Sequence, residues 1–276
     1  MAINWYPGHM AKAKREIREN MSLIDVVYEL IDARIPFSSK NPDIEELTKN
    51  KPKLLIMTKC DLCDMSKTNK FRLYYERLGY NVFMVNSVTG ENIDAVLKKT
   101  MEMAKVISEK RASRGLRERK TRIAILGVPN VGKSTLINKL SKSKKVRTGN
   151  MPGVTKIIDW IKVNDSLEIL DTPGVLEPRL KSEEVALNLA SMTVIKSELF
   201  DSEAVCVYII NKMLKDYPDK IIERYRLKDT SDMEVIIEGI AKRIGARKHG
   251  GADLDKVYST VIRDLREGRF GKVTFD

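Results

Sequence analysis

A glycine-rich segment near the middle of the chain carries the residues best suited to bind phosphate. Residues 127–134 read Gly-Val-Pro-Asn-Val-Gly-Lys-Ser, the G-x-x-x-x-G-K-S pattern of a phosphate-binding loop. The apolar run 122–127 before it predicts a strand and residues 134–140 predict a helix, which is the context that this pattern requires. Lys133 can reach the terminal phosphates, and Ser134 can offer its hydroxyl to magnesium. We therefore expect the loop to bind a nucleotide through Asn130, Val131, Gly132, Lys133, Ser134 and Thr135.

A second motif, Asp171 to Gly174 (Asp-Thr-Pro-Gly), follows a predicted strand over 167–170. Asp171 can hold the outer coordination sphere of magnesium, and the Gly174 N–H can sense the terminal phosphate. The Gly- and Pro-containing segment 147–155 ends in Thr155, whose hydroxyl can join magnesium. This segment resembles a switch loop that the terminal phosphate orders and hydrolysis releases. The alternative is an ordinary loop.

A third group of residues could read a base. Asp61 follows an apolar run over 53–58, and its carboxylate can accept hydrogen bonds from the N1–H and exocyclic amine of guanine, a donor pair that adenine lacks. The stem of Lys59 can lie along the base, and Asn86 and Ser87 begin a short loop that could offer backbone N–H groups to guanine O6. Thr58 stands where most GTPases have Asn, so we expect weaker guanine affinity but unchanged specificity.

The order of these motifs is rotated. In an ordinary GTPase the base-reading residues follow the phosphate-binding loop, whereas here Thr58 to Asp61 precede it. The rotation indicates a circularly permuted GTPase. It also joins Gly174 covalently to the C-terminal part of the chain, so that switch movement could pass directly to that part.

The elements that must position these residues are short apolar strands separated by helical stretches. This alternation predicts an α/β fold, a mostly parallel sheet covered on both faces, with a hairpin over 158–170 and an exposed helix over 10–20. After Gly174, helical spacing of apolar residues dominates, as over 233–244. We predict a P-loop GTPase domain over 1–176, containing a basic connection over 105–121, and a small all-α domain over 177–276.

The charge of the chain is uneven. Its 276 residues carry a net charge of +12, but residues 177–276 hold 18 basic and 18 acidic side chains, so the excess lies in residues 1–176. The basic residues are densest over 105–122 and 139–147. Such clusters are typical of RNA or DNA binding, although a solvated helix face is the competing interpretation.

The composition indicates a soluble protein of a reducing compartment. Charged residues make up 32% of the chain, and no apolar run approaches the roughly 18 residues that span a bilayer. The N-terminus lacks the apolar core of a signal peptide, so we expect a cytoplasmic protein. Cys60 and Cys63 form a C-x-x-C without a second cysteine pair, which favours loop cysteines over a zinc site.

With these motifs in place, the sequence resembles the circularly permuted GTPases of the ribosome biogenesis GTPase A type. The resemblance covers essentially the whole chain, including Trp5 to Ala13, the Asp32-Ala33-Arg34-Ile35-Pro36 segment and the phosphate-binding loop. It implies a GTP-hydrolysing factor in late assembly of the large ribosomal subunit, with magnesium as cofactor and a helical C-terminal domain that contacts rRNA. It further implies binding to the subunit precursor in the GTP form and release on hydrolysis, by a protein that we expect to be monomeric. The rival interpretation is an RNA-binding scaffold that uses GTP only as a structural ligand.

The catalytic group is not where many GTPases have it. Val175 occupies the position after Asp-x-x-Gly at which a Gln orients water, and its side chain cannot form a hydrogen bond. The resemblance nominates His9, in a turn before the first helix, to orient water or accept its proton, although a structural or rRNA-contacting role competes. It also nominates Asn130 to hold a potassium ion near the β- and γ-phosphates, where the ion could replace an arginine finger.

Overall fold

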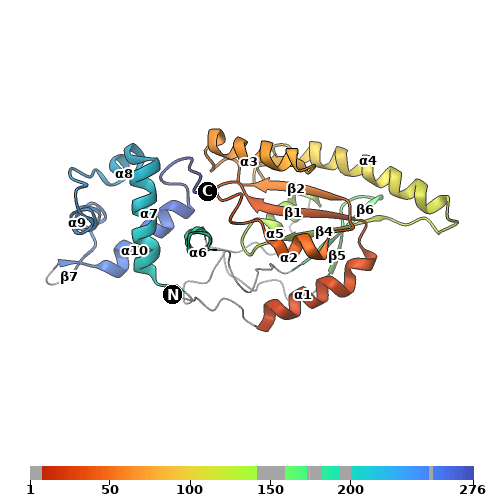
Figure 1. The fold of residues 1–276 in the computed structure, drawn as a ribbon, viewed down its shortest axis with the longest axis horizontal. Helices are drawn as coiled ribbons and strands as arrows, with labels where there is room; N and C mark the ends of the chain where they lie inside the picture. Colours follow the sequence, from red (N-terminus) through yellow and green to blue (C-terminus); the bar gives the residue numbers. More distant parts are fainter. Residues whose placement is uncertain (1–7, 142–158, 173, 175–181, 193–199, 249–250) are drawn as a thin grey trace.

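The computed structural model describes residues 8–141, 159–172, 174, 182–192, 200–248 and 251–276. In these residues six strands form one sheet in the order β3-β2-β1-β4-β6-β5 (Figure 1). All neighbours pair in parallel except β5 and β6, which form the predicted antiparallel hairpin. The strands are β1 (Val26–Asp32), β2 (Lys53–Thr58), β3 (Asn81–Val85), β4 (Thr121–Gly127), β5 (Asp159–Lys162) and β6 (Leu167–Asp171).

Helices cover both faces of the sheet, as the nearly continuous apolar strands predict. Residues Val26, Tyr28 and Leu30 of β1 face a hydrophobic cluster that includes α4 and α5, whereas Val27 and Ile31 face clusters that include α1, α2 and α3. The alternation follows from the two-residue period of a strand. The helices are α1 (Gly8–Asn20), α2 (Pro42–Leu47), α3 (Met65–Arg77), α4 (Ile93–Ala112) and α5 (Lys133–Leu140), and a 3₁₀ turn, η1, spans Met21–Leu23.

Helix α1 corrects one expectation. The helix over 10–20 forms, but it is not exposed all round, because Ala13 and Ile17 are buried in the cluster with Val27 and Leu126. Two apolar residues four positions apart lie on one face of a helix, so a charged helix can still bury a narrow stripe.

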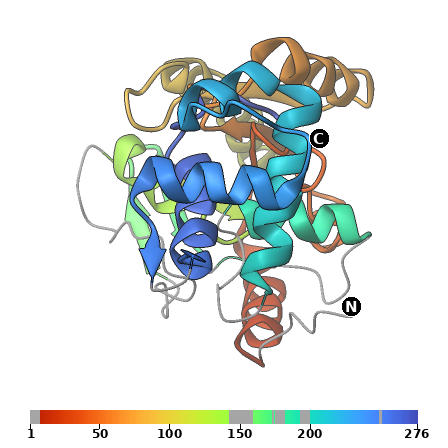
Figure 2. The same ribbon diagram turned by 90° about the vertical axis from the view of Figure 1, so that its left-hand side faces the viewer.

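The C-terminal part is helical, as predicted, with α6 (Glu183–Ser191), α7 (Ser202–Asp216), α8 (Pro218–Tyr225), α9 (Met233–Ile244) and α10 (Leu254–Arg266). A two-residue ladder of β7 (Arg247–Lys248) and β8 (Gly251–Ala252) precedes α10. These helices lie beyond the ends of the parallel strands, and Figure 2 shows them in front of the sheet. The predicted boundary between residues 176 and 177 lies outside the described residues.

The last residues of the chain bind the helical part to the sheet domain. The Val273 N–H donates to the Leu62 carbonyl at 3.0 Å, and the Phe275 N–H donates to the Arg34 carbonyl at 2.8 Å. The Asp276 carboxylate accepts from the Phe37 and Ser38 N–H groups at 2.6 and 2.9 Å. The C-terminal segment therefore docks beside the turns that follow β1 and β2. No helix in the described residues is long and apolar enough to cross a membrane.

Candidate nucleotide-binding site

The phosphate-binding loop runs from the end of β4 to the start of α5. Asn130 and Gly132 have φ angles of 59° and 106°, in the left-handed region, so the backbone turns sharply just before the N-terminus of α5. Gly127 is required by space, because a Cβ there would lie 2.7 Å from the Leu30 carbonyl oxygen. The start of the loop thus packs directly on β1.

Lys133 is the first residue of α5 and is only 8% exposed. Its Nζ donates to the Gly127 and Val128 carbonyls at 3.1 and 2.9 Å. The ammonium group therefore lies against the carbonyl oxygens at the start of the loop. Ser134 and Thr135 follow in the first turn of α5 and are half-buried.

The Asp-Thr-Pro-Gly motif reaches the same loop. Gly174 lies so close to Pro129 that an added Cβ would be 2.8 Å from the Pro129 Cα and N atoms. The Thr172 hydroxyl donates to the Ile125 carbonyl of β4 at 2.5 Å, which ties the end of β6 to β4. Asp171 is the last residue of β6, and its side chain, like all of Thr155, lies outside the described parts.

The base-reading segment meets the phosphate loop through Thr58, which is 1% exposed. Its Oγ1 lies 2.5 Å from the Val131 carbonyl oxygen and 3.2 Å from that of Ile31. A hydroxyl has one proton, so its hydrogen bond goes to the nearer acceptor, Val131. Thr58, which stands where most GTPases have Asn, therefore donates its only hydroxyl proton to the phosphate loop, and its effect on guanine affinity stays a prediction.

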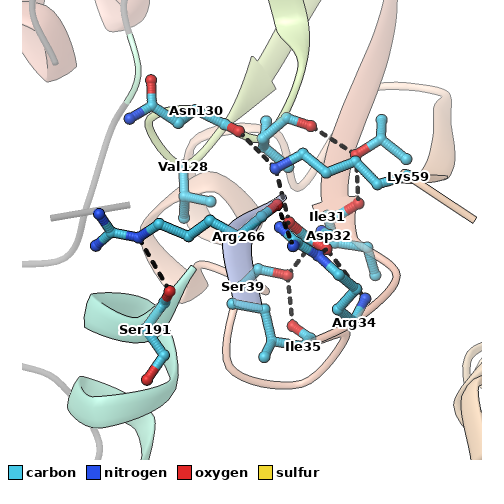
Figure 3. Close-up of polar contacts among 12 residues, drawn as sticks. Ile31, Asp32, Arg34, Ile35, Ser39, Lys59, Val128, Asn130, Ser191 and Arg266 are labelled. Atoms are coloured by element: carbon cyan, nitrogen blue, oxygen red, sulfur yellow. Dashed lines mark hydrogen bonds and ion pairs between the residues drawn. The ribbon is translucent and has the colours of Figure 1, made fainter. Parts of the chain in front are cut away.

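Lys59 has a φ of 58° and turns the chain sharply after β2. Its Nζ donates to Asp32 Oδ2 at 2.9 Å and to the Asn130 carbonyl at 2.9 Å, which links three loops (Figure 3). Asp61, two residues later, is exposed, and Asn86 and Ser87 follow β3 in buried positions. The Ser87 hydroxyl is buried and has no hydrogen-bond partner among the described residues, as would suit a group that receives a ligand.

Asp32 and Arg34 are site residues to which the sequence analysis gave no role. Asp32 ends β1, is 1% exposed, and forms a bidentate pair with Arg34 at 3.0 and 2.8 Å. Burial alone would raise the pKa of Asp32, but the neighbouring Arg34 and Lys59 charges outweigh it and hold that pKa far below its usual range. The sequence offered one signal for this role. Asp32 is a charged residue at the end of a mostly apolar strand, in which Glu29 is the other charged residue.

His9 lies within α1, which begins at Gly8, and not in a turn before the first helix. The His9 side chain lies outside the described atoms, so its catalytic role stays a prediction.

Cys60 and Cys63 are buried in the cluster with Ile31, Met57 and Tyr75. Burial raises the pKa of the Cys60 thiol to about 11, which disfavours the thiolate that binds zinc. Within the described residues, no group of three or more His, Cys, Asp or Glu side chains could hold a metal ion.

Known proteins share this arrangement over the whole chain. A family model described as 50S ribosome-binding GTPase matches residues 122–238. The GNP-bound structure of YlqF from T. maritima is 26% identical, with a TM-score of 0.71 over 96% of this chain and 97% of that one. Its GDP-bound structure is 25% identical, with a TM-score of 0.71 over 95% and 98%.

Curated relatives are more similar in sequence. Ribosome biogenesis GTPase A of Bacillus licheniformis is 41% identical over 100% of this chain and 98% of its own length. Mitochondrial ribosome-associated GTPase 1 of Mus musculus is 33% identical over 99% and 89%. The permuted order of the motifs, their convergence at the ends of β1, β2, β4 and β6, and this full-length similarity together place the chain in the ribosome biogenesis GTPase A family.

Proposed function

We propose that this GTPase acts in the cytoplasm as a monomer, binds the precursor of the large ribosomal subunit in its GTP form, and leaves it after hydrolysis. The observation that carries the proposal is the junction at Asn130, Val131 and Pro129. There the phosphate loop contacts Lys59, Thr58 and Gly174, which come from motifs on both sides of it in sequence. The names of the relatives support a role at the ribosome. A scaffold without turnover is less favoured, because these relatives are named GTPases.

The base would be read by Asp61, with Thr58, Lys59, Asn86 and Ser87 around it. Asp61 is exposed, so a guanine bound against it would satisfy and bury a carboxylate that now faces water. In competition with a fluorescent GDP, GTP should displace the probe and ATP should not. Asp61→Asn should transfer the preference to xanthosine nucleotides. Equal competition by ATP and GTP in the wild type would refute the guanine site.

The phosphates would lie against the amides of the loop, Lys133 and the N–H of Gly174. Magnesium would be held by Ser134 and Thr155, with Asp171 in its outer coordination sphere, and it would supply charge neutralisation at the β- and γ-phosphates. The oxygen donors of these residues suit that ion. Potassium would be held by Asn130, whose φ of 59° lies in the left-handed region.

Hydrolysis would depend on the ribosome. Val175 cannot orient water, so the isolated protein should turn over slowly, and large subunits should accelerate turnover by positioning His9 at the attacking water. His9→Ala should lose most of the stimulation but keep GTP binding and subunit binding, leaving a GTP-loaded complex on the subunit. Wild-type turnover that subunits leave unchanged would favour the scaffold. Full stimulation of His9→Ala would remove His9 from the mechanism.

Ribosomal RNA would be contacted by the helical domain. Its 18 basic and 18 acidic residues give no net charge, yet five basic side chains line one pocket of about 350 Å³ between α8, α9 and α10: Arg224, Arg243, Lys256, Arg263 and Arg269. Buried Asp264 binds Arg224 and Arg269, while none of the other three is within salt-bridge distance of a carboxylate among the described residues. A concave cationic surface of this kind suits phosphates of an RNA backbone. Arg243→Ala should weaken subunit binding and reduce its salt dependence, while fluorescent GDP affinity stays unchanged.

A further inference from the structure

A chain of polar contacts connects the phosphate loop to the helical domain. It begins at the Asn130 carbonyl, which accepts from Lys59, and continues through Asp32 to Arg34. The Arg34 Nη1 then donates to the carbonyl of Arg266, the last residue of α10, at 3.3 Å. Figure 3 shows these residues meeting between the end of β1 and the helical domain.

Arg266 extends the chain to α6. Its Nε donates to the Ser191 carbonyl at 3.1 Å and its Nη2 to the Ala190 carbonyl at 2.8 Å. These carbonyls belong to the last turn of α6, where helix carbonyls lack intrahelical partners and the helix dipole favours a cation. Arg266 thus fastens the C-terminal end of α6 to the end of α10.

The position of α6 makes this connection more than domain docking. Among the described residues, α6 is the first helix after Gly174, which lies so close to Pro129 that a Cβ would be 2.8 Å from it. One route from the loop to α6 is therefore the chain itself, from Gly174 onward. The other runs back from α6 through Arg266, Arg34, Asp32 and Lys59 to Asn130. A displacement of α6 would therefore act on the phosphate loop through both routes.

The buried partners leave little freedom in this second route. Arg34 and Asp32 are 2% and 1% exposed, and the Asp32 carboxylate is shared between Arg34 and Lys59. If Arg34 moved with α10, the buried Asp32 carboxylate would lose two charge-assisted hydrogen bonds, so the three side chains should move together. Lys59 is also the residue whose stem would lie along the base.

We propose that Asp32 and Arg34 are positioning residues of the guanine-nucleotide site, and that through Arg266 they make nucleotide affinity depend on the seating of α6. The inference rests on the proposed base-reading role of Lys59 and Asp61. Asp32 holds the Lys59 ammonium against the phosphate loop, and Arg34 holds Asp32 only while α10 and α6 are docked. A partner that shifts the helical domain would thereby change nucleotide affinity without touching the nucleotide.

The test uses the full-length protein and its affinity for a fluorescent GDP. Arg266→Ala removes a side chain that donates to the Ser191 and Ala190 carbonyls, and we expect about five-fold weaker binding, the lower end of typical coupling between sites. Arg266→Lys, which can still donate to one of the α6 carbonyls, should recover part of the affinity. Arg247→Ala, an exposed arginine of the β7–β8 ladder, is the matched control and should bind like the wild type.

A double-variant cycle separates coupling from simple loss of structure. Arg34→Lys keeps the charge but loses the bidentate geometry, and it should weaken GDP binding. Adding Arg266→Ala to Arg34→Lys should weaken it no further, because the chain of contacts is already broken. Wild-type affinity in Arg266→Ala, or additive losses in the double variant, would overturn the inference. A wild type without guanine preference would instead refute the proposed base site.

Discussion

The Thr58 hydroxyl offers the sharpest test of how the base-reading segment supports the phosphate loop. Thr58→Val keeps the shape of the side chain and removes the proton that Oγ1 donates to the Val131 carbonyl at 2.5 Å. Both atoms are in a fully buried setting, with Thr58 and Val131 each 1% exposed. The variant therefore leaves a carbonyl of the phosphate loop without this partner.

The magnitude follows from those contacts. A neutral hydrogen bond contributes about 1 kcal/mol, and leaving its buried partner unsatisfied costs about 1–3 kcal/mol. Thr58→Val should therefore destabilise the native loop conformation by roughly that free energy, compared with loop conformations in which the Val131 carbonyl accepts from another donor. If the competent loop falls to a tenth of the population, apparent nucleotide affinity falls about ten-fold. We expect a five- to thirty-fold loss of GDP affinity, which corresponds to about 1–2 kcal/mol.

The assay is titration of fluorescent GDP together with thermal unfolding. Thr58→Ser keeps the hydroxyl and loses a methyl group, so it should lose stability by about 1 kcal/mol but bind GDP within about two-fold of the wild type. Thr58→Val should instead bind GDP five- to thirty-fold more weakly than the wild type. If Thr58→Val binds GDP like the wild type, the hydroxyl does not hold the loop. If both variants lose affinity equally, packing and not the hydrogen bond supports it.

Three further predictions concern other parts of the molecule. If Asn130 holds potassium, replacing sodium by potassium at constant ionic strength should raise GTP turnover, and Asn130→Ala should abolish the rise; a rate indifferent to the cation removes potassium from the mechanism. Asp264 is fully buried and accepts hydrogen bonds from Arg224 and Tyr225 at 2.9 and 3.0 Å. Asp264→Asn should therefore destabilise the helical domain by about 2–3 kcal/mol. This is below the usual cost of breaking a buried ion pair, because Arg224 is partly exposed. Cys206 is buried in this domain, where desolvation raises the pKa of its thiol to about 12. Labelling of this thiol in a urea titration should therefore show a lower unfolding midpoint for Asp264→Asn than for the wild type. An unchanged midpoint would contradict the prediction. Burial opposes ionisation of Glu45, but hydrogen bonds from Lys40, Lys53 and Tyr80 prevail and lower its pKa from 4.5 to about 2, so its stabilising effect is complete above pH 4.5 and disappears as the pH falls towards 2. The difference in urea midpoint between wild type and Glu45→Gln should therefore shrink over that interval, and a difference constant with pH would disprove the assignment.

Local features of this protein could be derived from the sequence, because neighbours along the chain determine them. The phosphate loop depends on two glycines, a lysine and a strand–helix context within one short segment, and the structure has β4 and α5 on either side of it. Helix α9 begins at Met233 and ends at Ile244 as predicted, since Asp232 caps its start and Gly245 adopts the left-handed conformation at its end. The order of the motifs also revealed the permutation.

Other features depend on residues that only the folded chain brings together. Arg34 and Arg266 are 232 residues apart, and the chain of contacts that joins them requires β1 and α10 to meet. The neutral composition of residues 177–276 concealed a pocket lined by five basic side chains, because counts along a chain do not show which face each helix presents. The helix over 10–20 seemed exposed for the same reason, and Ala13 and Ile17 became core residues once the sheet lay beneath them. Thr58 could be recognised as a departure from Asn, but its hydroxyl acquired a partner only when the turn after β2 packed against the phosphate loop. The charge of a surface, the burial of a side chain and its hydrogen-bond partners all depend on which elements pack against each other, and only the tertiary structure determines that packing.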